Sequence, residues 1–409
     1  MNRRRFLTAL AALPLRADEL PPVRAITRGP KFHWFGYYDK LQFDPSSRYA
    51  LGCQGSFEHR LPTADDSLRI GMVDLEDNNR WIDLGETSAW SWHQTCMLQW
   101  LPGSDREIIW NDRIDGRFVS HIADIKAGTS RVNPSPIYCL SPDAKWALAT
   151  DFRRLFEMRP ETGYAGVPDP NRDSLAPDNA GIWRVNLASG KSELILSYAA
   201  VAAFPNQLEN AKGAKHWVNH LLIAPDGKRF VFLHRWRPRG QASGFVTRMF
   251  TASADGTDLR LIDSYGKTSH FIWRDASHLL AWCWQPSHQE RFYLLEDPPG
   301  KVEAVAPDVL TRNGHCTYLR GNRWILTDTS PDRERKQHPY LFDTMTNKAH
   351  PLGHFYSAPE YTGFWRCDTT PRASPDGRKV IFDSPHGGNG RQMYLVDVSG
   401  IVGDTLPHA

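Results

Sequence analysis

The stretch "APDGKRFVFLHRW" (residues 224–236) joins a tight turn to a run of apolar and aromatic residues. Proline presets one backbone angle of such a turn and glycine permits the next, and the residue types after it are those that strands favour. The stretch therefore predicts a hairpin turn that leads into a β-strand.

The same turn recurs along the chain, each time between two short apolar runs. The copies are "DPSSR" (44–48), "LPGSD" (101–105), "SPDAK" (141–145), "APDGK" (224–228), "WRDAS" (273–277), "LRGNR" (319–323) and "SPDGR" (374–378). A third strand follows several of them, as in "GIWRVNLASG" and "QMYLVDVSG". An internal repeat of strand, turn, strand, loop and strand predicts an all-β, seven-bladed β-propeller. Two β-sandwiches are the less favoured alternative, because the repeat runs the full length.

Ring closure makes a separate prediction. The last blade, near residues 369–398, has too few strands of its own before the chain nearly ends. We expect its outer strand to come from "PVRAITR" (22–28), so that an N-terminal strand closes the ring and removes an exposed sheet edge.

The N-terminal segment "MNRRRFLTALAALPLRADEL" (1–20) places three arginines before a short apolar run. This pattern predicts a bacterial export signal of the twin-arginine type rather than a disordered basic tail. We therefore expect residues 21–409 to form a single propeller domain that is periplasmic or secreted. No later run is long and apolar enough to be a membrane helix.

Composition excludes some partners. The 49 basic and 46 acidic residues leave a formal charge of +3 without a long basic run, which argues against nucleic acid. An anionic ligand needs only local arginine and histidine side chains. The six cysteines form no CxxC pair and specify no disulfide framework.

Several histidines fall at matched positions in consecutive blades. Counting five residues back from the turn proline, or its equivalent, gives His220, Ser269 and His315 in three consecutive blades, and His270 follows Ser269 directly. Counting nine residues forward gives His234 and Cys283. Imidazole and thiolate are good ligands for zinc-like ions. We predict a structural site for zinc or another divalent metal at His220, His270, Cys283 and His315, with His234 as a further candidate. The alternative is a set of hydrogen-bonded core histidines.

Earlier blades place other polar groups at the predicted mouth of the channel. His93 and Gln94 begin one inner strand, Tyr138 lies in the next, and Arg154 follows "ATDF". Catalytic candidates are His93, Tyr138 and Arg154, and substrate-binding candidates are Trp92, Gln94, Asn111, Arg113, His234 and Arg235.

The order His93, Tyr138, Arg154, with gaps of 45 and 16 residues, resembles the seven-bladed polysaccharide lyases. These include the ulvan lyases and the L-rhamnose-α-1,4-D-glucuronate lyases; oligogalacturonate lyase and TolB-type propellers are more distant. The sequence departs from the pattern in two places. "IGMVDL" lacks a second histidine, and "RCDTTPRAS" carries Thr369 and Thr370 where oligogalacturonate lyases have metal-binding histidines.

The resemblance implies β-elimination at an anionic poly- or oligosaccharide, which leaves a 4,5-unsaturated uronate. Arg154 would grip the carboxylate, while His93 and Tyr138 would share the base and acid roles. We expect an exported, monomeric lyase of uronate glycans. A non-catalytic TolB-like propeller that binds a glycan or a protein is the alternative. The glycan, the metal, endo or exo cleavage, and the order of base and acid stay open.

Overall fold

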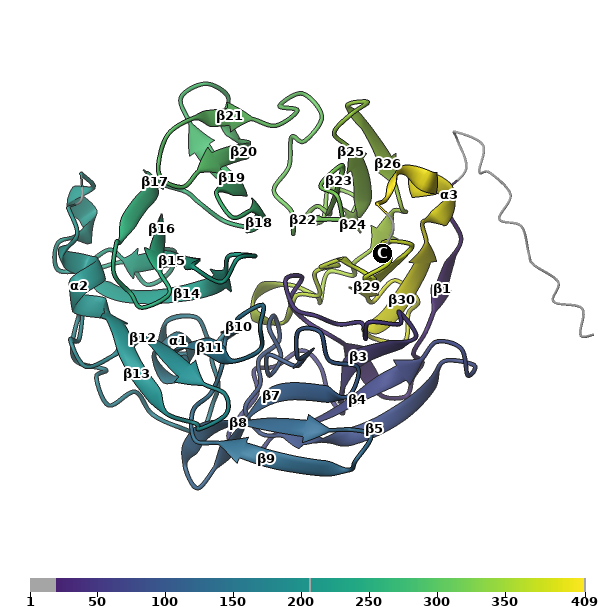
Figure 1. Ribbon diagram of the computed structural model, residues 1–409, viewed down its shortest axis with the longest axis horizontal. Helices are drawn as coiled ribbons and strands as arrows, with labels where there is room; N and C mark the ends of the chain where they lie inside the picture. The colour runs from purple at the N-terminus through teal and green to yellow at the C-terminus, as the bar shows by residue number, and fades with distance from the viewer. Residues whose placement is uncertain (1–19, 206, 408–409) are drawn as a thin grey trace, which may run out of the picture.

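The computed structural model describes residues 20–205 and 207–407, which form a ring of seven four-stranded antiparallel sheets (Figure 1). This confirms the predicted seven-bladed β-propeller. Most of the predicted export signal, residues 1–19, lies outside the described residues. Among the residues described, no helix has the length and apolar character needed to cross a membrane.

The first four blades run in chain order, from the inner strand to the outer one. Blade 1 is β2 (Phe32–Trp34), β3 (Tyr49–Gly55), β4 (Leu68–Asp74) and β5 (Arg80–Thr87); blade 2 is β6 (Gln99–Trp100), β7 (Glu107–Ile114), β8 (Arg117–Asp124) and β9 (Thr129–Asn133). Blade 3 is β10 (Cys139–Leu140), β11 (Trp146–Thr150), β12 (Gly181–Asn186) and β13 (Ser192–Ser197); blade 4 is β14 (Lys215–Ile223), β15 (Arg229–Arg237), β16 (Val246–Ser253) and β17 (Arg260–Gly266).

The remaining blades complete the ring. Blade 5 is β18 (Phe271–Asp275), β19 (His278–Gln285), β20 (Gln289–Glu296) and β21 (Val302–Ala304); blade 6 is β22 (Thr317–Tyr318), β23 (Trp324–Thr327), β25 (Tyr340–Asp343) and β26 (Lys348–Pro351). Blade 7 is β28 (Arg372–Ala373), β29 (Lys379–Ser384), β30 (Gln392–Asp397) and β1 (Val23–Ala25), and β24 (Lys336–Gln337) pairs with β27 (Phe355–Tyr356). Short helices are α1 (Phe152–Met158), α2 (Tyr198–Ala203), α3 (Ser399–Val402), η1 (Glu209–Ala211), η2 (Gly363–Trp365) and η3 (Gly403–Thr405).

The N-terminal strand closes the ring as predicted. β1 pairs antiparallel with β30, with Val23 opposite Val396 and Ala25 opposite Tyr394. Ile26 continues the seam by donating its backbone N–H to the Met393 carbonyl. The first described strand is thus the outer edge of the last blade, so the two ends of the chain hold the ring together.

Five of the seven repeated turns share one backbone feature. Their fourth residue has a left-handed φ whether it is glycine, as at Gly227 (71°), or not, as at Ser47 (61°) and Ala144 (55°); the turns at 101–105 and 273–277 differ. Asp226 stabilises its turn by accepting a hydrogen bond from the backbone N–H of Lys228. The turn, rather than glycine itself, is the conserved feature of the repeat within this chain.

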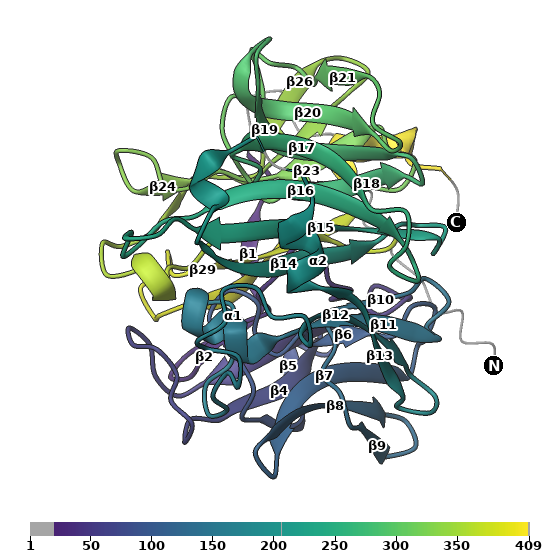
Figure 2. The ribbon, with the colours of Figure 1, turned by 90° about the vertical axis from the view of Figure 1, so that its left-hand side faces the viewer.

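Each turn joins the two innermost strands of a blade at one end of the ring. Because strands alternate in direction, the loops between blades and the loops between second and third strands lie at the opposite end. Figure 2 shows α1 and β24, both from these loops, at that same end. Apolar faces of adjacent blades pack between the sheets, with buried Trp217, Phe230 and Phe250 in one such cluster.

Candidate functional site

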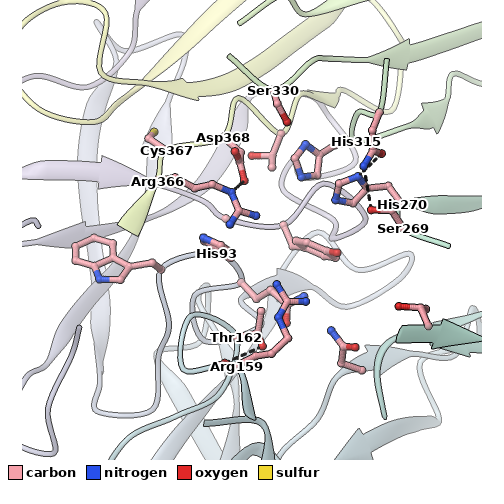
Figure 3. A pocket seen from close by; sticks show the side chains of 18 of the residues that line it. His93, Arg159, Thr162, Ser269, His270, His315, Ser330, Arg366, Cys367 and Asp368 are labelled. Carbon is pink, nitrogen blue, oxygen red and sulfur yellow. Dashed lines mark hydrogen bonds and ion pairs between the residues drawn. The ribbon is translucent and has the colours of Figure 1, made fainter. Parts of the chain in front are cut away.

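A cavity of about 480 Å³ opens at the end of the propeller opposite the repeated turns (Figure 3). All seven blades or their loops contribute to its wall, from Trp34 in blade 1 to Arg391 in blade 7. A cavity lined by every blade lies on the propeller axis. Loops long enough to reach inward, rather than the strands, supply most of its charged groups.

The structure brings some of the predicted residues together and separates others. The wall includes Trp92, His93, Gln94, Arg235, His270 and His315. Tyr138, Arg154, Asn111, Arg113, His234, His220 and Cys283 do not line this cavity.

His93 lies in the loop between β5 and β6, and its backbone N–H donates to the Glu161 carbonyl at 3.2 Å. Its side chain is partly exposed to the cavity, yet the Nε2 atom is buried with no hydrogen-bond partner among the described residues. Burial, followed by the positive charge of Arg366, lowers the pKa of His93 well below its ordinary value. The imidazole is therefore neutral at neutral pH and is available as a base.

Arg235 is a buried cation of the cavity wall. It comes from β15, where Nη1 donates to Asn219 Oδ1 at 3.0 Å and Nε donates to Thr247 Oγ1 at 3.2 Å. Among the described residues, no carboxylate forms an ion pair with it. Burial and the nearby Arg159 lower the pKa of Arg235 to about 9, which still leaves the guanidinium charged at neutral pH.

Other cations of the wall are already paired. Arg159 lies 2.7 Å from Glu161, Arg366 lies 2.7 Å from Asp368, and Arg391 lies 2.7 Å from buried Glu58. Arg391 also stacks on Trp92, with its guanidinium carbon 4.2 Å from the ring centroid. Arg235 is therefore the cation best placed to receive an anionic group from a ligand.

Tyr138 lies behind the wall rather than on it. Its side chain is fully buried, its hydroxyl exchanges hydrogen bonds with the Gln94 side chain, and it accepts the backbone N–H of His220 at 2.8 Å. Burial raises the pKa of Tyr138 well above its ordinary value. Tyr138 supports Gln94, which does face the cavity.

Arg154 is turned away from the cavity because the chain after β11 becomes helical. The Asp151 side chain caps α1, and Arg154 lies within that helix. Its guanidinium donates to the carbonyls of His216, Ser174 and Leu175 and pairs with Asp169 at 3.2 Å. The sequence interpretation placed Arg154 just after a strand, at the mouth of the channel, and did not predict the helix, for which the capping Asp151 was the signal.

Three predicted substrate ligands also make internal contacts. Asn111 links blades 2 and 3 through the backbone N–H and carbonyl of Ile137, each at 2.7 Å. Arg113 donates to the Ala64 carbonyl. His234 bonds His216 and Arg248, because neighbouring residues of a strand face opposite sides and Arg235 takes the cavity side.

The four predicted metal ligands do not form a metal site, although the three histidines are neighbours: ring centroids are 6.5 Å apart for His220 and His270 and 4.1 Å apart for His270 and His315. His220 uses both ring nitrogens on the hydroxyls of Tyr37 and Tyr38, at 3.2 and 3.0 Å. The Nδ1 atoms of His270 and His315 bond Asn313 and Asp328. Cys283 lies in an apolar cluster, and burial raises its thiol pKa. In residues 20–205 and 207–407, no three His, Cys, Asp or Glu side chains form a metal-binding group.

Sequence reasoning missed several wall residues: Tyr37, Arg159, Asn219, Arg366, Asp368 and Arg391. Asn219 lies on an inner strand directly before His220, which the count from the turns selected. Tyr37 lies just after the inner strand of blade 1. Arg159 and Arg366 come from long loops whose paths no repeat predicts. "FGYYDK" (35–40) was the strongest available signal, since two tyrosines follow an inner strand there.

The ring and its axial cavity place the chain in the class of seven-bladed β-propellers. No family model matches the chain, and no curated protein matches it. Among solved structures, an oligogalacturonate lyase in complex with manganese has a TM-score of 0.66 and 16% identity, covering 94% of this chain and 95% of the other. An oligogalacturonate lyase from Vibrio parahaemolyticus has a TM-score of 0.65 and 14% identity, covering 93% and 95%.

A protease domain shares the architecture as well. The β-propeller domain of the Trilobed protease from Pyrococcus furiosus has a TM-score of 0.51 and 11% identity, covering 90% of this chain and 94% of the other. That domain is described as having an open velcro topology, whereas β1 closes the ring here. At these identities the comparisons establish the fold, and chemistry has to be argued from the cavity.

Proposed function

We propose that this chain is a lyase that cleaves a uronate-containing glycan by β-elimination. The observation that carries the proposal is the pairing, in one cavity, of a neutral imidazole with a buried guanidinium that has no carboxylate partner among the described residues. A uronate supplies the missing carboxylate and presents an acidic C–H bond beside it. The similarity in fold to two oligogalacturonate lyases supports the same reaction class.

The carboxylate is the first requirement of this reaction. While it is charged, the C5 proton is too weakly acidic to remove, so the developing enolate needs positive groups around it. Arg235 can grip a carboxylate through two N–H groups and stays charged, with Arg159 close enough to lower its pKa. We assign the carboxylate site to Arg235, with Arg159 and its partner Glu161 beside it, instead of Arg154, whose guanidinium is used inside the protein.

Two different groups of the cavity carry out the proton transfers. His93 takes the C5 proton, the C5–H electron pair forms the C4–C5 double bond, and the C4–O4 bond breaks with its electrons on O4. O4 then needs a proton. We assign this donor role to Tyr37, which lines the cavity and whose hydroxyl lies 3.2 Å from His220 Nδ1. Burial and Asp39 raise the pKa of Tyr37, so the hydroxyl keeps its proton until the leaving oxygen requires it.

The oligogalacturonate lyase of similar fold was solved in complex with manganese. The residues described here do not fit such an ion, because no three His, Cys, Asp or Glu side chains among them form a metal-binding group and both ring nitrogens of His220 are bonded to tyrosine hydroxyls. No step of the mechanism uses a metal. Zinc stays a sequence-based proposal, and elemental analysis of protein purified without chelators tests it: less than a tenth of an equivalent rules it out.

The substrate class is a glucuronate or related uronate glycan, and export to the periplasm or beyond would bring the enzyme to it as a monomer. Replacing Arg4 and Arg5 with lysine tests export, because a twin-arginine signal would then fail. Gel filtration tests the oligomeric state.

The decisive experiment incubates the protein with ulvan, gum arabic and other uronate glycans and follows the ultraviolet absorbance of the new conjugated double bond. A rise that disappears in His93→Ala and Arg235→Gln supports the proposal. A flat trace on every glycan, together with measurable binding, would instead identify a non-catalytic glycan-binding propeller.

A further inference from the structure

Phe245 is an aromatic side chain of the cavity wall that is exposed to solvent. It is the last residue of the loop between β15 and β16, it lines the cavity wall, and 39% of its surface is accessible. The loop residues before it, 239–244, are exposed as well. A large apolar ring at the edge of a polar cavity is a common feature of ligand-binding sites.

The ring lies next to the proposed carboxylate site. Its centroid lies 4.6 Å from the guanidinium carbon of Arg235 and 4.9 Å from that of Arg159. Both distances fall within the range of cation–π attraction. Trp217 packs against the ring from below, with centroids 5.9 Å apart. One aromatic ring therefore holds together two guanidiniums that come from different blades and repel each other.

The backbone in front of Phe245 fixes where the ring can go. Gly244 has a φ of 81°, a left-handed angle that disfavours other residues, and its carbonyl accepts a long hydrogen bond from Arg237 Nε at 3.4 Å. Val246 then enters β16 opposite Trp236. The sharp turn at Gly244 brings the chain back over the cavity instead of out into solvent.

We propose that Phe245 is a specificity-determining residue whose exposed surface packs on the apolar face of a sugar ring, while the adjacent Arg235 holds that sugar's carboxylate. A uronate offers both parts at once, a flat set of C–H bonds and an anion at its edge. The identity of the ligand as a uronate rests on the proposed function. The stacking role rests on the exposure of the ring and on its contacts with the two arginines.

The test compares Phe245→Ala, Phe245→Tyr and Phe364→Ala. Phe364 is 45% exposed and does not line the cavity, so it is a matched control for loss of a surface phenylalanine. We expect Phe245→Ala to raise KM about tenfold or more and to change kcat by less than about threefold, since stacking affects ground state and transition state alike. Phe245→Tyr keeps the ring and should stay near the parent, as should Phe364→Ala.

A binding measurement separates this inference from the lyase reaction. Glucuronate and glucose are titrated into each intact variant by NMR, and Phe245→Ala should weaken glucuronate binding about tenfold. If the parent cleaves no glycan but this loss is seen, the lyase proposal fails and the inference stands. If the parent cleaves uronate glycans and Phe245→Ala changes KM by less than twofold, or no more than Phe364→Ala does, the inference alone fails. A parent that neither cleaves glycans nor binds glucuronate overturns both.

Discussion

At the scale of single residues, the protonation of His93 is set by charges on three different loops. Arg366 and Asp368 lie before blade 7, Arg159 follows α1, and Arg391 precedes β30. After burial, Arg366 is the main group that lowers the pKa of His93, and Asp368 opposes it. Since catalysis needs the neutral imidazole, we expect the acidic limb of the pH–rate profile to fall below the ordinary histidine pKa of about 6.5.

Two substitutions should move that limb in opposite directions. Arg366→Gln removes a cation and leaves Asp368 unpaired, so the His93 pKa rises. The acidic limb of the pH–rate profile should then move to higher pH. Asp368→Asn leaves Arg366 unpaired, so the pKa falls and the limb moves to lower pH. The measurement is kcat/KM of each variant against pH. A limb that stays in place in both variants would show that it does not report His93.

Tyr37 and Tyr138 form a second test, because the same loss of one hydroxyl has different consequences. Tyr37→Phe removes the proposed proton donor, and turnover should fall about 10²-fold. Tyr138→Phe breaks contacts to Gln94 and the His220 backbone behind the wall, and turnover should change by less than about tenfold. Steady-state kinetics on one glycan compare them. Equal losses would return the acid role to Tyr138.

These residues also show what sequence could predict of the site. The count from the repeated turns locates a residue along a strand, and it selected His270 and His315, predicted as metal ligands, which line the same cavity as His93, Gln94 and Arg235. It cannot predict which side of the backbone is sealed by a neighbouring loop. Tyr138 was misplaced for that reason, since Gln94 closes over it.

At the scale of elements, α1 determines which arginine of blade 3 reaches the cavity. The helix withdraws Arg154 from the axis and places Arg159, at its C-terminal end, on the cavity wall. Arg154 then links α1 to the segment 169–175 and to β14. It acts on the site by positioning α1 and the loop that follows it.

Arg154 should therefore behave as a stability residue. Arg154→Leu leaves Asp169 buried without its partner, and we expect a loss of about 3–5 kcal/mol in the free energy of unfolding. Denaturant unfolding measures this, with Arg153→Leu as the control because Arg153 is partly exposed and pairs with Asp151. A fully stable Arg154→Leu protein with no activity would contradict this and favour direct contact with substrate.

At the scale of the whole molecule, the repeat was sufficient to predict the ring and its closure. Seven turns of related sequence each join the two inner strands of a blade, and the short last blade requires a strand from the other end of the chain. The long loops obey no such rule: residues 151–180 and 352–371 depend on contacts such as Arg154 with Asp169 and the Arg391 guanidinium with the Trp365 carbonyl. The fold was therefore predictable where the chain repeats itself, and the cavity was predictable only in part.

Buried histidines make the stability of the whole propeller depend on pH. His93, His216, His220, His234 and His270 all have lowered pKa values, mainly through burial, whereas Asp263 and His315 have raised ones that act in the opposite sense. For a lowered histidine, both states are neutral above about pH 6.5, so nothing is lost there. Below it the unfolded chain binds a proton that the folded protein does not, and stability falls until the folded pKa is reached.

His216 isolates this effect, because burial lowers its pKa to about 4 and its ring lies outside the cavity, 2.9 Å from His234. Between pH 7 and pH 5 this one group should cost about 2 kcal/mol of stability. His216→Gln removes the titration and keeps a hydrogen-bonding side chain, so the loss on acidification should shrink by about that amount while turnover at neutral pH is retained. Denaturant unfolding of the parent and the variant at the two pH values measures the difference. An identical pH dependence in the two proteins would mean that His216 has the same pKa in the folded protein as in the unfolded chain.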